Sequence, residues 1–373
     1  MKITVIIPTY NEGENIKILI PQLFDVFKDF KSYEFSILVV DGNSKDTTVK
    51  QVRTLMKDHK NLFLIEEESK SGLGSAYIKG FEYCMSKLKS DYVVEMDADL
   101  QHSPNDLSKM LNEIKNNYDL IIGSRYVAGG SIPKQWNLRR KFISFFGSFF
   151  ARVVLRIFKI KDFTSGFKIT KVKGVLDKID FTKVKSKGFA YKIDLLTRMY
   201  DMGIKIIEVP IAFGLRDRGT SKMEQKNFND SLKVVLGFAV ERNKNFIKFL
   251  IVGFGGLFID YFVFSFSFFV LHILDYTKFI SGFSAMIFTF TMNNFFSFKD
   301  RKKTKLSEFV PYASLYILSS SIPIFVGQQI IDFTRSIFGK DLVAINVAFF
   351  VGIFIGLVWN YTVYSKIIWR KRL

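Results

Sequence analysis

Cysteine, histidine and proline are scarce in this chain. Its 373 residues include one cysteine (Cys84), three histidines and seven prolines. A single thiol excludes a disulfide framework within the chain and a zinc site built from several cysteines. The histidines, His59, His102 and His272, are scattered along the sequence, so no histidine-based catalytic array is expected.

Phenylalanine and positive charge, by contrast, are abundant. The chain has 42 phenylalanines, 48% hydrophobic residues and a formal net charge of +19. Such an excess of base favours an anionic partner. No zinc-knuckle spacing, RNP-like strand or recognition-helix signature is present. We therefore expect phosphate-bearing substrates and membrane lipids as partners, and no nucleic acid.

The composition changes near residue 245, where charges become rare. Four apolar segments follow, each close to the ~20 residues that cross a bilayer, at about 246–270, 279–298, 309–333 and 342–367. The link at 299–305 and the C-terminal end are rich in lysine and arginine, whereas the other two links are short and weakly basic. This asymmetry, together with an N-terminus that lacks a signal-peptide pattern, predicts an integral membrane protein with four spans. Both termini and the N-terminal half would face the cytosol, at the cell membrane if the organism is a prokaryote.

A hydrophobic run at 92–96 leads directly into Asp97, Asp99 and Gln101. In an extended strand end, these alternate positions project to one side. Hard oxygen ligands grouped in this way suit Mg²⁺ or Mn²⁺, which keep open positions for water and phosphate oxygens. The pattern therefore predicts a metal-diphosphate site, although an Asp-x-Asp triplet alone is equally typical of a polar loop after a strand.

Two earlier segments show the same pattern, in which an apolar run is followed by polar residues. The β-rich run at 2–9 is followed by Tyr10, Asn11 and Glu12, and the run at 35–40 is followed by Asp41. Helical patterns separate these runs, which predicts an α/β fold with polar residues at the carboxyl ends of parallel strands.

These motifs resemble glycosyltransferase family 2, and within it the polyprenol-phosphate mannosyltransferases, or dolichol-phosphate mannose synthases. The resemblance rests on the segments at 8–12, 40–41, 97–102, 123–126, 165–167 and 208–210. It implies a GT-A catalytic domain of Rossmann-like architecture over residues 1–225. The last part of the chain resembles the GtrA-like four-helix membrane domain. We thus expect an interface linker at 226–245 and the membrane domain at 246–373.

The resemblance also implies roles for individual residues. Asp97, Asp99 and Gln101 would bind the metal. The donor would contact Pro8, Tyr10, Glu12, Asp41, Asp97, Ala98, Arg216, Arg218 and Lys222. The acceptor phosphate would contact Arg125, Arg140 and Ser144, and the catalytic set would be Asp99, Arg125, Arg140 and Arg216. Tyr10 and Glu12 are equally typical of a turn and a helix start, where the helix dipole favours an acidic side chain.

By the same resemblance, the expected reaction is metal-dependent transfer of mannose from GDP-mannose to dolichyl or another polyprenyl phosphate, with inversion. The product, dolichyl-phosphate mannose, would serve glycosylation at the membrane. An alternative within the class is a polyprenol-phosphate glucosyltransferase that uses UDP-glucose. An alternative of another class is a non-catalytic carrier or flippase of lipid-linked sugars.

Two segments between these regions have amphipathic character. Residues 143–160 place five phenylalanines among basic residues, and residues 228–242 mix apolar and basic side chains. Basic amphipathic helices commonly lie in the bilayer interface. The alternative for each segment is an ordinary helix packed on the core.

Overall fold

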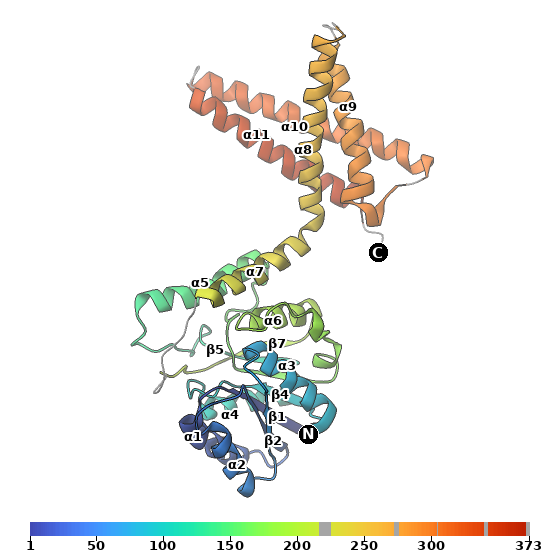
Figure 1. Cartoon of the computed structure of the whole chain (residues 1–373). Helices are drawn as coiled ribbons and strands as arrows, with labels where there is room; N and C mark the ends of the chain where they lie inside the picture. Colours follow the sequence, from blue (N-terminus) through green and yellow to red (C-terminus); the bar gives the residue numbers. More distant parts are fainter. Residues whose placement is uncertain (216–224, 272–275, 304, 339–341, 371–373) are drawn as a thin grey trace. The chain divides into compact units, whose positions relative to one another are not determined.

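The computed structural model describes residues 1–215, 225–271, 276–303, 305–338 and 342–370 (Figure 1). The chain divides into two compact units, Met1–Ala239 and Val240–Leu373. The first unit is built on a sheet, and the second consists of helices. The α/β class expected for the N-terminal part is confirmed.

The sheet has seven strands in the order β3-β2-β1-β4-β6-β5-β7. Their bounds are β1 Lys2–Thr9, β2 Glu34–Asp41, β3 Leu62–Glu66, β4 Tyr92–Glu95, β5 Leu120–Ser124, β6 Lys168–Lys171 and β7 Ile206–Pro210. Strand β1 pairs in parallel with β2 on one side and with β4 on the other. The carboxyl ends of these three strands therefore meet at one edge of the sheet.

Strand β6 differs from the all-parallel arrangement that the sequence suggests. It runs antiparallel to both β4 and β5. The strand has only four residues, two of which are Lys168 and Thr170. Such a short and partly polar segment lacks the hydrophobic run by which the other strands are recognised.

Two hydrophobic cores cover the two faces of the sheet. Along β1, Ile3, Val5 and Ile7 contribute to one core and Ile6 to the other, as the two-residue period of a strand requires. Helices α1 Gly13–Phe27, α2 Thr48–Asp58 and α4 Pro104–Asn112 pack on the first face. Helices α3 Leu73–Tyr83 and α6 Tyr191–Asp201 pack on the second. The described part of this unit also contains short helical turns, namely η1 Cys84–Leu88, η2 Glu113–Asn116, η3 Leu176–Lys178 and η4 Phe181–Lys183.

The two amphipathic segments form helices of different character. Helix α5, Leu138–Val154, leaves Phe142 and Phe145 64% and 56% exposed. Helix α7, Gln225–Arg242, places Val234, Val235 and Phe238 in the core that covers the second face of the sheet. The exposed face of α5 fits an interface helix, whereas α7 is in large part a core-facing helix.

The second unit contains α8 Lys244–Phe269, α9 Thr277–Met292, α10 Leu306–Phe338 and α11 Leu342–Val363, with the turn η6 Lys299–Arg301 after α9. Within the described residues, three stretches are long and apolar enough to cross a membrane: Lys244–Phe269, Val310–Ile337 and Asn346–Ile368. The segment expected as the second span forms a 16-residue α-helix, α9, that continues into a π-helix.

The ends of α9 and α11 resemble each other. Helix α9 passes into the π-helix η5, Asn293–Ser297, and α11 passes into the π-helix η7, Tyr364–Ile368. Helices α10 and α11 approach closely at two glycines, because a Cβ added at Gly352 would lie 3.2 Å from the Cα of Gly327. This contact explains why small residues occur there.

Candidate active site

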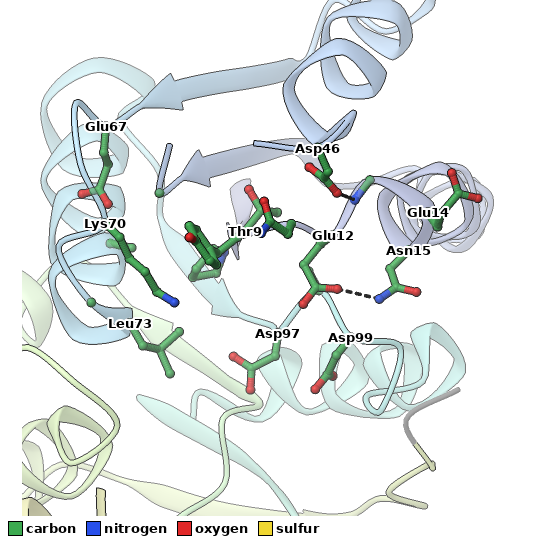
Figure 2. A pocket seen from close by; sticks show the side chains of 18 residues that line it. Thr9, Glu12, Glu14, Asn15, Asp46, Glu67, Lys70, Leu73, Asp97 and Asp99 are labelled. Carbon is green, nitrogen blue, oxygen red and sulfur yellow. Dashed lines mark hydrogen bonds between the residues drawn. The ribbon is translucent and has the colours of Figure 1, made fainter. Parts of the chain in front are cut away.

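A cavity of about 620 Å³ lies at the carboxyl ends of β1, β2 and β4. Figure 2 shows Asp97 and Asp99 beside Glu12, with Lys70 and Glu67 on the opposite side. Of the residues expected at the donor and metal sites, those that line it are Pro8, Tyr10, Glu12, Asp97, Ala98 and Asp99, and Asp41 is not among the lining residues. Sequence segments almost a hundred residues apart therefore converge on one hollow.

Asp97 is held at both of its carboxylate oxygens. The hydroxyl of Tyr77, on α3, donates to Oδ1 at 3.1 Å, and Lys192, on α6, lies with Nζ 3.1 Å from Oδ2. Burial alone would raise the pKa of Asp97, but the positive charge of Lys192 and the hydrogen bonds hold this pKa below its ordinary value. Asp97 is thus an ordered anion, with 27% of its side chain exposed.

Asp99 and Gln101, the other two expected metal ligands, lie on a turn that contains a strained residue. The backbone N–H of Gln101 donates to Oδ1 of Asp99 at 3.2 Å. Leu100, between them, has a φ of 60°, a left-handed conformation that is rare for a non-glycine residue. The Gln101 side chain is buried and donates from Nε2 to the carbonyl of Gly214 at 3.0 Å. Asp97 and Asp99 line the cavity, whereas Gln101 is not among its lining residues. Because the side-chain nitrogen of Gln101 is bonded to Gly214, its amide oxygen is the atom that would bind a cation.

The charges around the cavity fit a bound cation. Six carboxylate residues and one lysine line it, namely Glu12, Glu14, Asp46, Glu67, Asp97, Asp99 and Lys70. Among the described residues, no group of three or more His, Cys, Asp or Glu side chains is clustered to enclose a metal ion. Mg²⁺ and Mn²⁺ commonly use one or two protein carboxylates and take their other ligands from water and substrate phosphates. The carboxylates of Asp97 and Asp99 are ligands that fit such a metal ion. An anionic diphosphate would need this ion in order to bind in a cavity lined by carboxylates.

Two expected donor residues have local structural roles as well. Asp41 is fully buried and accepts hydrogen bonds from the hydroxyls of Thr9 and Ser44, at 2.8 and 2.6 Å. It fixes the loop that presents the neighbouring Gly42 to the cavity. Glu12 is the N-cap residue of α1 and accepts a 2.6 Å hydrogen bond from Asn15. For Glu12, the helix-start and cavity-lining interpretations therefore both apply.

The residues expected at the acceptor phosphate lie apart from the lining of this cavity. Arg125 is nearly buried and forms an ion pair with Asp162, with Nη2 2.7 Å from Oδ1. The hydroxyl of Tyr126 donates to Ser144 at 2.7 Å. Arg140, one turn before Ser144 on α5, stacks its guanidinium 4.1 Å from the ring centre of Trp136. Arg216, Arg218 and Lys222 lie outside the described residues.

Sequence reasoning missed His102 as a structural partner of the metal-binding motif. His102 stacks on Phe167, with ring centres 4.9 Å apart, and its Nδ1 accepts a long, 3.4 Å hydrogen bond from the backbone N–H of Asp97. Burial lowers the pKa of His102 to about 4, so the ring is neutral at physiological pH. The sequence feature that could have indicated this role is the position of His102 directly after the acidic motif.

Lys192 and Tyr77 were also missed, because they are separated from Asp97 by 95 and 20 residues. Neither belongs to a local motif that marks an acidic site. Only the packing of α3 and α6 against the same face of the sheet brings them together.

Comparison with known proteins adds family information to this geometry. Residues 4–176 match glycosyl transferase family 2, and residues 248–369 match the GtrA/DPMS transmembrane domain. The chain is 38% identical over 229 residues to polyprenol monophosphomannose synthase of Mycolicibacterium smegmatis, covering 61% of this chain and 83% of that protein. It is 36% identical to undecaprenyl-phosphate mannosyltransferase of Micrococcus luteus, over 60% of this chain and 88% of the relative. It is 34% identical to dolichol-phosphate mannosyltransferase of Pyrococcus furiosus, over 70% of each chain.

Proposed function

This chain belongs to glycosyltransferase family 2, among the polyprenol-phosphate mannosyltransferases that carry a GtrA/DPMS membrane domain, and we propose that it transfers mannose from GDP-mannose to a polyprenyl phosphate. The observation that carries this proposal is the cavity beside β1, β2 and β4, into which Asp97 and Asp99 both project (Figure 2). The names of the three relatives supply the sugar and the class of acceptor.

The donor is proposed to lie along the cavity with its diphosphate near Asp97 and Asp99. A divalent ion there, Mg²⁺ or Mn²⁺, would neutralise the leaving diphosphate. Asp97, Asp99 and Gln101 are the proposed ligands. Pro8, Tyr10 and Glu12 would face the nucleoside part, while Asp41 orders the adjoining loop through Thr9 and Ser44.

The acceptor needs no general base from the protein. A lipid monophosphate has a second pKa near ~6 and is largely a dianion at neutral pH. Its oxygen can attack the anomeric carbon while the bond from that carbon to the diphosphate breaks, so the configuration inverts. The protein's task is to hold the phosphate in line. Arg140 and Ser144 are proposed to do so, with Arg125 positioning this region through Asp162.

Transfer of labelled sugar to dolichyl phosphate tests the proposal, with GDP-mannose and UDP-glucose compared in the presence of Mn²⁺. Label in the lipid phase from GDP-mannose alone is the expected result. Label from UDP-glucose alone would replace the assignment by a glucosyltransferase. Transfer from neither donor would overturn both assignments and favour a non-catalytic carrier.

The variant Asp99→Ala tests the metal assignment within the same assay. It should reduce turnover at least ~100-fold, the magnitude usual for loss of one strong electrostatic contact in a transition state. The matched control is Glu14→Ala, which removes another carboxylate of the same cavity at the first turn of α1. Equal effects of both variants would contradict a specific metal role for Asp99.

The chain is a membrane protein, and we propose that four helices cross the bilayer with the catalytic unit in the cytosol. The basic link around Lys302 would then be cytosolic. In a Cys84→Ser background, the variant Lys302→Cys should react with an impermeant maleimide only after the cells are permeabilised. Labelling in intact cells would contradict this orientation.

A further inference from the structure

Lys192 occupies an unusual place for a lysine. Its side chain is only 2% exposed, and its ammonium lies 3.1 Å from Oδ2 of Asp97. The ring centre of Phe189 lies 5.0 Å from the same nitrogen. A buried charge requires a counterion, because removing an unpaired ammonium from water is strongly unfavourable. Asp97 is the carboxylate that supplies it.

The protein backbone leaves space for this ammonium. A Cβ added at Gly166 would lie 2.2 Å from Lys192 Nζ and 2.7 Å from Asp97 Oδ2. A side chain at position 166 would therefore have to displace the ammonium of Lys192 or the carboxylate of Asp97. Lys192 lies in the first turn of α6, and the residues that follow it on this helix pack into the core, which fixes the backbone from which its side chain extends.

A second lysine of the catalytic unit is also buried, and burial lowers its pKa. Lys168 is fully buried on β6, directly opposite Glu95 in the β4–β6 pairing. Lys168 therefore lies near Glu95 and not in an ion pair with Asp97, whose negative charge is already paired with Lys192 before any metal ion binds.

From this arrangement we infer that Lys192 is a positioning residue that keeps Asp97 and Asp99 from holding a divalent cation tightly before the donor diphosphate arrives. A cation bound to Asp97 would lie close to a fixed ammonium, and like charges at such range repel strongly in a partly buried site. The negative charges of a diphosphate would offset this repulsion. The metal ion and the nucleotide would consequently each strengthen the binding of the other. The inference rests on the proposed function, since it assumes a diphosphate donor.

Metal affinity measured without any nucleotide separates this role from a structural one. Removing a residue that only supports the fold would weaken metal binding or leave it unchanged. Removing Lys192 should instead strengthen it. We therefore expect Lys192→Gln and Lys192→Met to bind Mn²⁺ about tenfold more tightly than the native chain, from the Coulomb energy of one nearby charge. The measurement is titration of the full chain in detergent, with free Mn²⁺ followed by electron paramagnetic resonance.

Lys79→Gln is the matched control. Lys79 lies 2.6 Å from Glu67, another cavity carboxylate, so the variant also removes a lysine that is paired at this cavity. Its Mn²⁺ affinity should stay within about twofold of the native value, because the paired carboxylate is not a proposed ligand. Thermal melting of every variant identifies a folding defect. Unchanged or weaker Mn²⁺ binding by folded Lys192→Gln and Lys192→Met, or an equal gain in Lys79→Gln, would overturn the inference.

The effect of nucleotide on Mn²⁺ affinity provides a second test of the inference. In the native chain, saturating GDP should tighten Mn²⁺ binding by a larger factor than it does in Lys192→Gln, and by reciprocity Mn²⁺ should tighten GDP binding by the same factor. Equal factors in both proteins would contradict the inference. Sugar transfer by the native chain tests the proposed function separately. Native transfer with no gain in Lys192→Gln metal affinity rejects the inference alone, whereas a gain without transfer from any donor rejects the function.

Discussion

Arg125 donates two side-chain hydrogen bonds to Asp162, from Nε to Oδ2 at 2.8 Å and from Nη2 to Oδ1 at 2.7 Å. Asp162 is in turn fixed by Glu208 on β7, whose carboxylate accepts its backbone N–H at 2.9 Å. The pair therefore connects the end of β5 to β7 beside the proposed acceptor region. Both partners are almost fully buried.

The first prediction follows from this burial. Asp162→Asn leaves the Arg125 guanidinium without its counterion, and breaking a buried ion pair from one side costs roughly 3–5 kcal/mol. The melting temperature of the full chain in detergent should fall markedly. The control is Asp25→Asn, which breaks an exposed pair with Lys28 and should leave melting unchanged. Similar melting of native and Asp162→Asn proteins would show that the pair contributes little.

The second prediction concerns the stability of the protein at low pH. Burial would raise the pKa of Asp162, but the charge and hydrogen bonds of Arg125 hold it below the ordinary value of 3.8. A carboxyl with a lowered folded pKa stabilises the fold above its unfolded pKa, and this stability is lost as the pH falls through the folded value. The native chain should therefore lose melting temperature more steeply than Asp162→Asn below about pH 4. Parallel pH profiles would argue against this origin of acid sensitivity.

The sequence predicted the acidic edge of the catalytic unit better than its supporting contacts. Asp97 and Asp99 follow a hydrophobic strand, and this local pattern is enough to place them at a carboxyl edge. Lys192 has no such signal, because its contact with Asp97 depends on the packing of α6. The ion pair of Arg125 with Asp162 was likewise hidden, since a lone arginine in a loop says nothing about a partner 37 residues away.

The same contrast holds for secondary structure. The apolar run at 279–298 predicted one continuous span, yet the α-helix ends at Met292 and a π-helix begins at Asn293. Hydropathy registers the composition of a segment and not how its backbone hydrogen bonds are arranged. Strand β6 was missed for a related reason, because its pairing with β4 and β5 is a tertiary interaction.

The third prediction compares two glycines in helices. A Cβ at Gly80, on α3, would meet Cγ2 of Ile6 at 2.7 Å, while a Cβ at Gly147, on α5, would meet nothing within 4 Å. Gly80→Ala should destabilise the chain by about 1–3 kcal/mol, because it overpacks the contact between α3 and β1. Gly147→Ala should stabilise α5 by about 0.5–1 kcal/mol. Thermal melting of the two variants should shift in opposite directions, and shifts of the same sign would contradict the packing argument.

The fourth prediction concerns the second unit. The Asn294 side chain accepts a 2.9 Å hydrogen bond from the indole of Trp369 and bonds the backbone of Lys303 in both directions. Asn294→Ala would leave these buried groups without partners, at a cost of about 1–3 kcal/mol for each buried group. The detergent-solubilised chain should aggregate at a lower temperature. Asn346→Ala is a useful comparison, because Asn346 is exposed at its position on α11 and its loss should change little.

The fifth prediction addresses the apolar face of α5. Phe142 and Phe146 stack with ring centres 5.4 Å apart and are 64% and 41% exposed. Arg140 and Ser144 lie on the same helix, so this face would set the depth at which they meet a lipid phosphate. Replacing both phenylalanines by serine should raise KM for dolichyl phosphate in proteoliposomes about three- to tenfold, while kcat and melting stay near native values.

Membrane attachment itself should not change in this double variant, since the apolar helices of the second unit remain. A short, water-soluble prenyl phosphate should show an unchanged KM, because its phosphate does not depend on the depth of α5. Ile18→Ser, which removes an exposed apolar side chain from α1, controls for a general loss of surface hydrophobicity. If KM rose equally for the long and short acceptors, the phenylalanines would act on the phosphate site itself and not through the lipid interface.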